Sequence, residues 1–200
     1  MSVFKLPDSL CDELTGMIRI YWWGQKEGKH KMAWLSWEKM CTPKDKGELG
    51  FRDLKAFNLA PLAKQGWRLQ MNSYFLVHRV LKARYFPNTN FLHMELGSKP
   101  SFAWRSILAA QSVVNSGYRW QVGDGKSIGI WTDRWLPRPS TFRVLTPPAQ
   151  LPANTRVEYP IDQENGNWNL DMMHQIFLQD DATSILSIPL SRQMPHDCMI

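Results

Sequence analysis

The chain has 200 residues, of which 44% are hydrophobic, and a formal net charge of +6. This length and hydrophobic content are enough to form a globular core. No apolar run approaches the roughly 20 residues that span a bilayer, so we expect no membrane partner. The three cysteines, Cys11, Cys41 and Cys198, lie far apart, which disfavours both a disulfide framework and a zinc site.

Positive charge is concentrated toward the front of the chain. Residues 1–135 hold 20 Lys and Arg against 11 Asp and Glu, whereas residues 136–200 hold 4 against 7. A basic front part rich in tryptophan suits a surface that contacts nucleic acid. A solvated basic face without a ligand is an equally good interpretation.

The first two thirds of the chain predict helices. Residues 7–23 carry one apolar stripe that we expect in the core: Leu10, Leu14, Met17, Ile18 and Tyr21. A short helix is expected over residues 34–40. The central helix, residues 53–69, begins at Asp53 as its cap, and Pro61 predicts a break near Ala60. Gly66 indicates the close approach of another backbone, because glycine weakens a helix interior by about 1 kcal/mol.

Two more helices are expected at residues 73–85 and 101–115. In the first, Leu76, Val77, Val80 and Leu81 should face inward, with Phe75, Arg79 and Lys82 on the opposite side. We also expect most tryptophans in the core, namely Trp22, Trp34, Trp67, Trp104, Trp131 and Trp135.

The pattern then changes to the alternation of a strand. Residues 118–122 and 127–131 predict a β-hairpin around Gly123-Asp124-Gly125. Six prolines between residues 137 and 160 predict a linker, and residues 161–200 predict a short acidic helical tail. The sequence therefore predicts a mainly α fold: a bundle of about five helices with one hairpin in residues 1–136, then the linker 137–160, then the tail.

No motif in the chain predicts catalysis, a cofactor or a small-molecule substrate. Gly125-Lys126-Ser127 imitates the end of a phosphate-binding loop but lacks the earlier glycine and precedes a strand. The pair Asp180-Asp181 precedes a helix, where capping explains it better than magnesium binding. We expect no enzyme activity and no metal site.

Two pairs of cations are candidate nucleic-acid contacts. Lys64 and Arg68 are four residues apart, so their like charges disfavour the helix unless a phosphate or an acidic side chain lies between them. Arg79 and Lys82 share a helix face with Phe75, and this face could follow a sugar-phosphate backbone or could be plain surface.

Several motifs resemble one family. They include Tyr21-Trp22-Trp23-Gly24, Gly50-Phe51-Arg52-Asp53-Leu54, Trp104-Arg105-Ser106-Ile107, and Gly123-Asp124-Gly125 followed by Ile-x-Ile-Trp and Asp-x-Trp. With these motifs, nearly the whole chain resembles the region downstream of the polymerase domain in plant LINE-type (non-LTR) retrotransposon reverse transcriptases.

The resemblance implies a fragment between the polymerase palm and a C-terminal zinc-binding module. Helices in that thumb-like position hold an RNA or DNA duplex by its backbone without reading sequence. The expected function is non-catalytic nucleic-acid binding, and the alternative is an inert or structural remnant of a decayed reading frame. An intracellular site, in the nucleus or an organelle, fits the chain, while its compartment and oligomeric state stay open.

Overall fold

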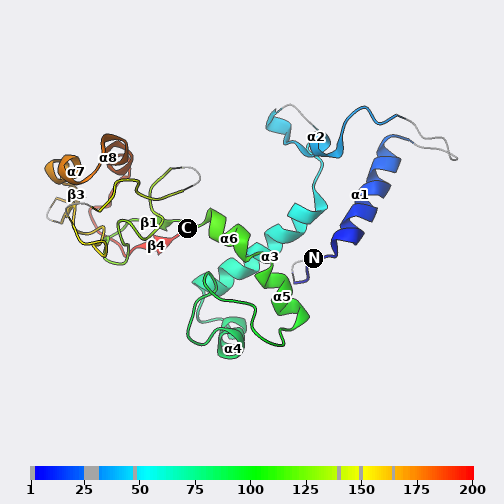
Figure 1. Cartoon of the computed structure of the whole chain (residues 1–200), viewed down its shortest axis with the longest axis horizontal. Coiled ribbons are helices and arrows are strands. Elements are labelled where there is room, and N and C mark those ends of the chain that lie inside the picture. Colours follow the sequence, from blue (N-terminus) through cyan, green and yellow to red (C-terminus); the bar gives the residue numbers. More distant parts are fainter. Residues whose placement is uncertain (1–2, 25–31, 47–48, 139–140, 149–150, 164) are drawn as a thin grey trace. The chain divides into compact units, whose positions relative to one another are not determined.

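The computed structural model describes residues 3–24, 32–46, 49–138, 141–148, 151–163 and 165–200. It is mainly helical, as the sequence predicted, and divides into two compact units, Met1–Asn115 and Ser116–Ile200 (Figure 1). Unit 1 contains α1 (Asp8–Trp22), α2 (Trp37–Cys41), the 3-10 helix η1 (Lys44–Lys46), α3 (Leu54–Met71), α4 (Leu76–Tyr85) and α5 (Phe102–Leu108), and α6 (Gln111–Gly117) crosses the division.

Helix α3 is the centre of unit 1. Asp53 caps it, since its Oδ1 accepts hydrogen bonds from the amides of Lys55 at 2.9 Å and Ala56 at 3.4 Å. The break expected near Ala60 is absent, because α3 continues through Pro61. Proline has the backbone φ of a helix and costs about 3 kcal/mol inside one. Burial of the α3 side chains on both sides of Pro61 offsets this cost.

The buried face of α3 contacts two segments that lie far from it in the sequence. The amide group of Asn58, 2% exposed, accepts from the Leu6 amide at 2.8 Å and donates to the Phe4 carbonyl at 3.1 Å. At Gly66, an added Cβ would lie 2.5 Å from the ring of Phe91. The close approach expected at Gly66 therefore exists, but a buried side chain makes it rather than a backbone.

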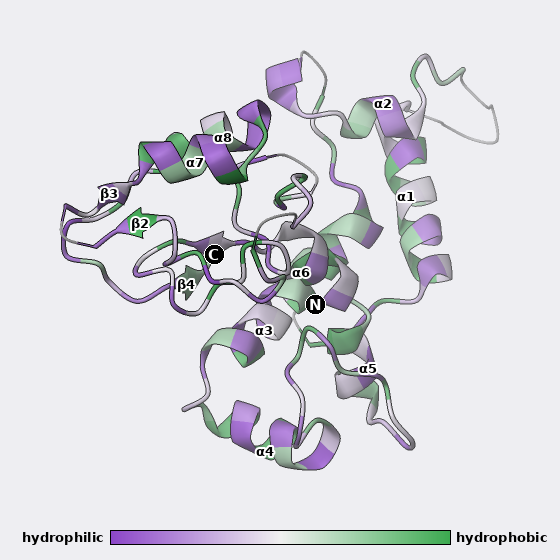
Figure 2. Cartoon of the chain, turned by 60° about the vertical axis from the view of Figure 1, so that its left-hand side comes forward, coloured by the Kyte–Doolittle hydropathy of each residue, from purple (hydrophilic) through white to green (hydrophobic). Residues whose placement is uncertain are grey.

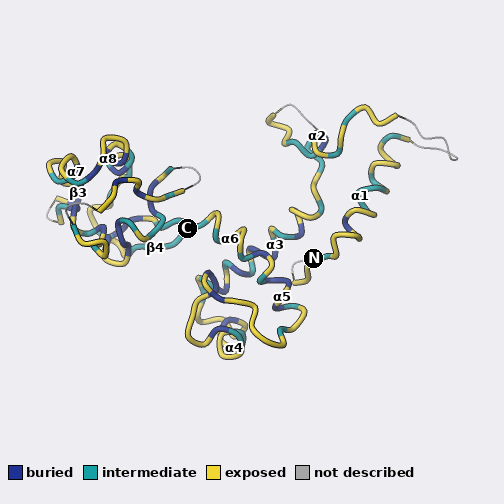
Figure 3. The backbone as a smooth tube through the Cα atoms, in the orientation of Figure 1, coloured by how far each residue is buried: buried dark blue, intermediate teal, exposed yellow. Residues whose placement is uncertain are grey.

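Two expected apolar faces are not buried. In α1 only Cys11 is buried, while Met17 and Tyr21 are 55% and 86% exposed. In α4 only His78 is buried, and hydrophobic residues alternate with hydrophilic ones along its exposed turns (Figures 2 and 3). The helical period of both sequences is correct, but in the described part of unit 1 each of these apolar side chains stays half-buried or exposed.

The six tryptophans expected in the core differ in how far they are buried. Trp104 and Trp135 are fully buried, Trp67 and Trp131 are half-buried, and Trp22 and Trp34 are exposed. The helix expected over residues 101–115 is interrupted at Ala109 and becomes α5 and α6.

Unit 2 contains β1 (Trp120–Gln121), β2 (Ile161–Asp162), β3 (Asn167–Trp168), α7 (Leu170–Ile176), α8 (Gln179–Leu186) and β4 (Cys198–Met199). Strands β1 and β4 pair antiparallel, with Trp120 opposite Met199, and β2 pairs antiparallel with β3. Its core includes Ile128, Ile130, Leu136, Val157 and Ile185, each 0% exposed.

The predicted linker and hairpin both differ from the structure. Val144 and Val157 belong to the core of unit 2, so residues 137–160 are part of a folded unit, and the division falls at residues 115/116 instead of 136/137. The segment 128–130 hydrogen-bonds to residues 155–157 rather than to 118–122, through Val157 N to Ile128 O at 2.9 Å and Ile130 N to Thr155 O at 3.0 Å. Proline has no amide donor, but the residues between the prolines keep theirs, and the Val157 amide donates the first of these two bonds.

Candidate nucleic-acid interface

Lys64 and Arg68 lie one turn apart on the exposed side of α3, opposite its buried residues Leu62 and Leu69. Among the described residues, neither side chain forms an ion pair with an acidic group. The sequence left two candidates for the group between these like charges, a phosphate or an acidic side chain of the protein. Within the described part of the chain no acidic side chain pairs with either cation. Both cations are therefore available to an external anion.

Helix α4 is attached to α3 through a buried histidine. Nδ1 of His78, 8% exposed, lies 2.6 Å from the Leu69 carbonyl oxygen in the last turn of α3. Phe86, at the end of α4, meets His78 edge-on and stacks on Trp104 of α5, with ring centroids 5.6 Å apart. These contacts fix α4 in place. Nothing in the apolar periodicity of the sequence indicated that His78 would be the buried residue.

Tyr85 adds a second stacked ring to this attachment. Its ring lies parallel to Trp104, with centroids 4.8 Å apart, and its hydroxyl accepts a hydrogen bond from the Ser101 amide at 3.2 Å. The hydrogen bonds from Ser101 lower the pKa of this hydroxyl. The face of α4 that contacts α5 is therefore the one with His78 and Tyr85.

Arg79 and Lys82 are both exposed on α4. Phe75 precedes the helix, and the Arg79 amide donates to its carbonyl at 3.1 Å, so the two side chains lie one turn apart. The structure also brings Arg68 of α3 and Phe75 to the rim of one groove. The two cation pairs thus belong to adjacent helices, and Arg68 and Phe75 mark where the helices meet.

The excess of positive charge follows the structural division. Residues 1–115 hold 17 Lys and Arg against 9 Asp and Glu, a net charge of +8, whereas residues 116–200 hold 7 against 9, a net charge of −2. An electrostatic attraction to polyanions is therefore a property of unit 1.

The loop that imitates a phosphate-binding sequence already holds an anion of the protein. Asp197 accepts hydrogen bonds from the amides of Gly123 at 2.8 Å, Gly125 at 2.9 Å and Ser127 at 2.8 Å. Gly125 has φ +72°, and an added Cβ would lie 2.5 Å from the Glu158 amide nitrogen. A bound nucleotide would have to displace Asp197, so the loop is structural.

Beside this loop, the mostly buried carboxylate of Asp124 contacts the exposed ring of His196. Burial raises the pKa of Asp124, but the Lys126 amide and the His196 ring, 3.2 Å away, outweigh burial and lower it overall. A lowered pKa means that this carboxylate stabilises the fold at neutral pH and loses the effect as the pH falls through that pKa.

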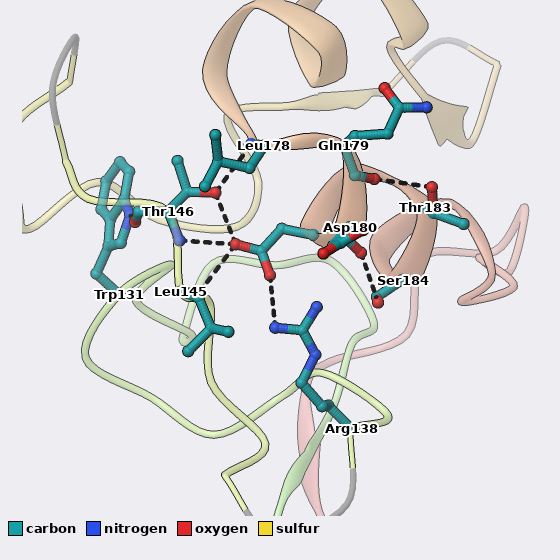
Figure 4. Close-up of polar contacts among 10 residues, drawn as sticks. Trp131, Arg138, Leu145, Thr146, Leu178, Gln179, Asp180, Thr183 and Ser184 are labelled. Atoms are coloured by element: carbon teal, nitrogen blue, oxygen red, sulfur yellow. Dashed lines mark hydrogen bonds and ion pairs between the residues drawn. The ribbon is translucent and has the colours of Figure 1, made fainter.

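The pair Asp180-Asp181 is not a metal site either. Asp181, 1% exposed, accepts from the amides of Leu145 at 2.9 Å and Thr146 at 2.7 Å, and from the Thr146 hydroxyl at 2.6 Å (Figure 4). Its other oxygen lies 2.9 Å from Nη1 of Arg138, a pairing by charge rather than by an aligned hydrogen bond. Neither aspartate caps α8, which begins after Leu178 without a side-chain cap. Asp181 instead fixes the segment that the sequence predicted as a linker.

Two further classes of site find no support in the described residues. No three His, Cys, Asp or Glu side chains among them gather closely enough to hold a metal ion. Their helices are also too short or too polar to cross a bilayer.

The chain has relatives in Arabidopsis thaliana. It is 42% identical over 137 residues to the uncharacterized mitochondrial protein AtMg00310, in a match that covers 68% of this chain and 89% of the relative. It is 37% identical over 139 residues to the protein named "Putative ribonuclease H protein At1g65750", covering 68% of this chain and 22% of that protein. No protein-family model and no solved structure matches. The chain belongs to the family of AtMg00310, and it spans about a fifth of the second relative.

Proposed function

We propose that unit 1 binds the sugar-phosphate backbone of nucleic acid without sequence preference, through Lys64, Arg68, Arg79 and Lys82. The observation that carries the proposal is the exposure of these cations on two helices that buried contacts hold together, with no ion pair to an acidic group among the described residues. Long cationic side chains on a fixed scaffold are the usual means of contacting phosphates.

We also propose that the chain is a non-catalytic fragment derived from a non-LTR retrotransposon reverse transcriptase, in the thumb-like position after the palm. The sequence motifs and the name of the ribonuclease H relative support this origin. Because Asp181 is buried and bonded to residues 145–146, and no three His, Cys, Asp or Glu gather to hold a metal ion, the described residues offer no candidate for polymerase or nuclease chemistry.

The experiment replaces Lys64, Arg68, Arg79 and Lys82 together by Gln, which has a similar helix propensity and so preserves both helices. Affinity is measured for two duplexes of equal length and unrelated sequence. We expect the variant to lose affinity for both duplexes to the same extent. A matched control replaces four cations of unit 2, Arg119, Lys126, Arg143 and Arg192, by Gln, and it should bind like the wild type.

Two outcomes would contradict the proposal. Equal loss in the two quadruple variants would mean that total charge and not this surface governs binding. A folded wild-type chain that binds no duplex at low salt would favour an inert remnant. Circular dichroism of all three proteins establishes that they are folded.

A further inference from the structure

Unit 1 contains an apolar groove between α3 and α4 with a volume of about 520 Å³. This size lies within the range of small-ligand sites, about 300–1,000 Å³. Gln65, Arg68 and Leu69 of α3 line one side, Phe75, Leu76 and Val77 line the other, and Val3 and Ile107 complete it.

The groove has a buried floor and exposed apolar walls. Leu69 and Ile107 are 5% and 8% exposed, whereas Phe75, Leu76 and Val77 are 55%, 71% and 60% exposed. Contiguous apolar side chains at this exposure are typical of a binding surface rather than of ordinary protein surface. Leu76 and Val77 were expected in the core, and the structure places them at the opening of this groove instead.

The polar groups of the groove limit what it can bind. The Gln65 amide can both donate and accept a hydrogen bond, and the Arg68 guanidinium adds a positive charge at the wall. Arg79 follows Phe75 by one helical turn, so a second cation begins on the same side of α4 as the aromatic residue. A fitting ligand has a flat apolar face, a polar edge and negative charge beside it.

We propose that this groove binds an unpaired nucleobase whose flanking phosphates contact Arg68 and Arg79. The inference rests on the proposed function, because it uses the same cations and adds the class of nucleic acid. A base in a duplex is stacked on both faces and cannot enter, whereas an unpaired base presents its face to an aromatic ring and its edge to an amide. The chain therefore prefers strands with unpaired nucleotides over intact duplexes.

The test compares two single strands of 20 nucleotides that carry the same number of phosphates, one with bases and one fully abasic. Both should bind with strong salt dependence, and the strand with bases should bind about tenfold more tightly, since stacking one base on an aromatic side chain has an effect of this order. A ribonucleotide strand measured in parallel identifies whether DNA or RNA bases are preferred.

The variant Phe75→Ala should remove most of this difference while leaving affinity for the abasic strand unchanged. Phe75 makes no side-chain cap contact to α4, so its loss does not remove a helix cap. The matched control is Tyr74→Ala, because Tyr74 is the adjacent aromatic residue, is 93% exposed and does not line the groove. A second variant, Leu76→Glu, introduces a negative charge at the opening and should also reduce the difference.

Different results would contradict phosphate binding by unit 1 and base binding by the groove. If neither strand binds, the proposed function is wrong. If both strands bind with equal affinity, or if Tyr74→Ala acts as strongly as Phe75→Ala, phosphate binding stands but the groove does not hold a base. Crosslinking of a 5-iodouracil strand, mapped by mass spectrometry, gives an independent result: attachment at Phe75 supports the groove, and attachment only in unit 2 contradicts it.

Discussion

Gly66 shows how a single missing side chain permits the packing of unit 1. The ring of Phe91, 1% exposed, fills the space where a Cβ would stand. We expect Gly66→Ala to destabilise the protein by about 1–3 kcal/mol, because overpacking outweighs the gain of about 1 kcal/mol in helix propensity. The control is Gly16→Ala in α1, where nothing lies within 4 Å and propensity alone should stabilise. Urea unfolding measures both, and stabilisation by Gly66→Ala would contradict this packing.

In unit 2, the buried Asp181 holds several polar groups in place through hydrogen bonds and an ion pair. Its replacement by Ala leaves a mostly buried guanidinium, two amides and a hydroxyl without their acceptor. Breaking a buried charge pair costs about 3–5 kcal/mol, so we expect Asp181→Ala to unfold unit 2 at a much lower urea concentration. Asp180→Ala, at the exposed neighbouring position, should cost no more than about 1 kcal/mol. Similar midpoints for the two variants would show that Asp181 does not hold residues 145–146.

At the scale of elements, the C-terminal strand closes unit 2. Strand β4 pairs with β1. Asp197, immediately before β4, accepts hydrogen bonds from three amides of the loop 123–127. We expect Asp197→Ala to cost about 1–3 kcal/mol, since those amides lose their acceptor. Asp197→Asn should be intermediate, because an amide oxygen can replace only one of the two carboxylate oxygens. Hydrogen exchange of Gly123, Gly125 and Ser127 provides the measurement, and unchanged exchange in Asp197→Ala would contradict the assignment.

Local sequence patterns predicted the helices better than they predicted which segments pack or pair with one another. The cap at Asp53 and the period of α1, α3 and α4 are visible in the sequence, because they depend on neighbouring residues. The pairing of 128–130 with 155–157, and of β1 with β4, depends on contacts distant in the chain. The break expected at Pro61 is wrong for a similar reason. The burial that offsets the cost of proline in the helix comes from contacts with other helices.

The candidate site was predicted in part. The spacing of Lys64 and Arg68, and of Phe75 and Arg79, indicated two exposed basic faces, and all four residues lie at the surface. The groove between the faces was not predictable, since the apolar residues Leu76 and Val77 have the pattern of a core face. Only the position of α4, which His78 fixes against α3, shows that these residues are exposed.

At the scale of the whole molecule, the division at residues 115/116 can be tested against the division at 136/137. Val157 is 0% exposed in the core of unit 2, whereas a linker residue would have no fixed partners. We expect Val157→Ala to destabilise unit 2 by about 0.5–3 kcal/mol and to raise hydrogen exchange throughout β1 and α8, with α3 unaffected. An exchange pattern identical to that of the wild type would restore the linker interpretation of residues 137–160.

The central claim is that four cations of α3 and α4 contact phosphates. Its most direct measurement is the slope of log affinity against log salt concentration, for one duplex, with the wild type and with the variant that has Gln at positions 64, 68, 79 and 82. Each phosphate contact contributes about 0.9 to this slope. We predict a steep slope for the wild type and a clearly shallower one for the variant, with both proteins folded. Equal slopes would contradict the account.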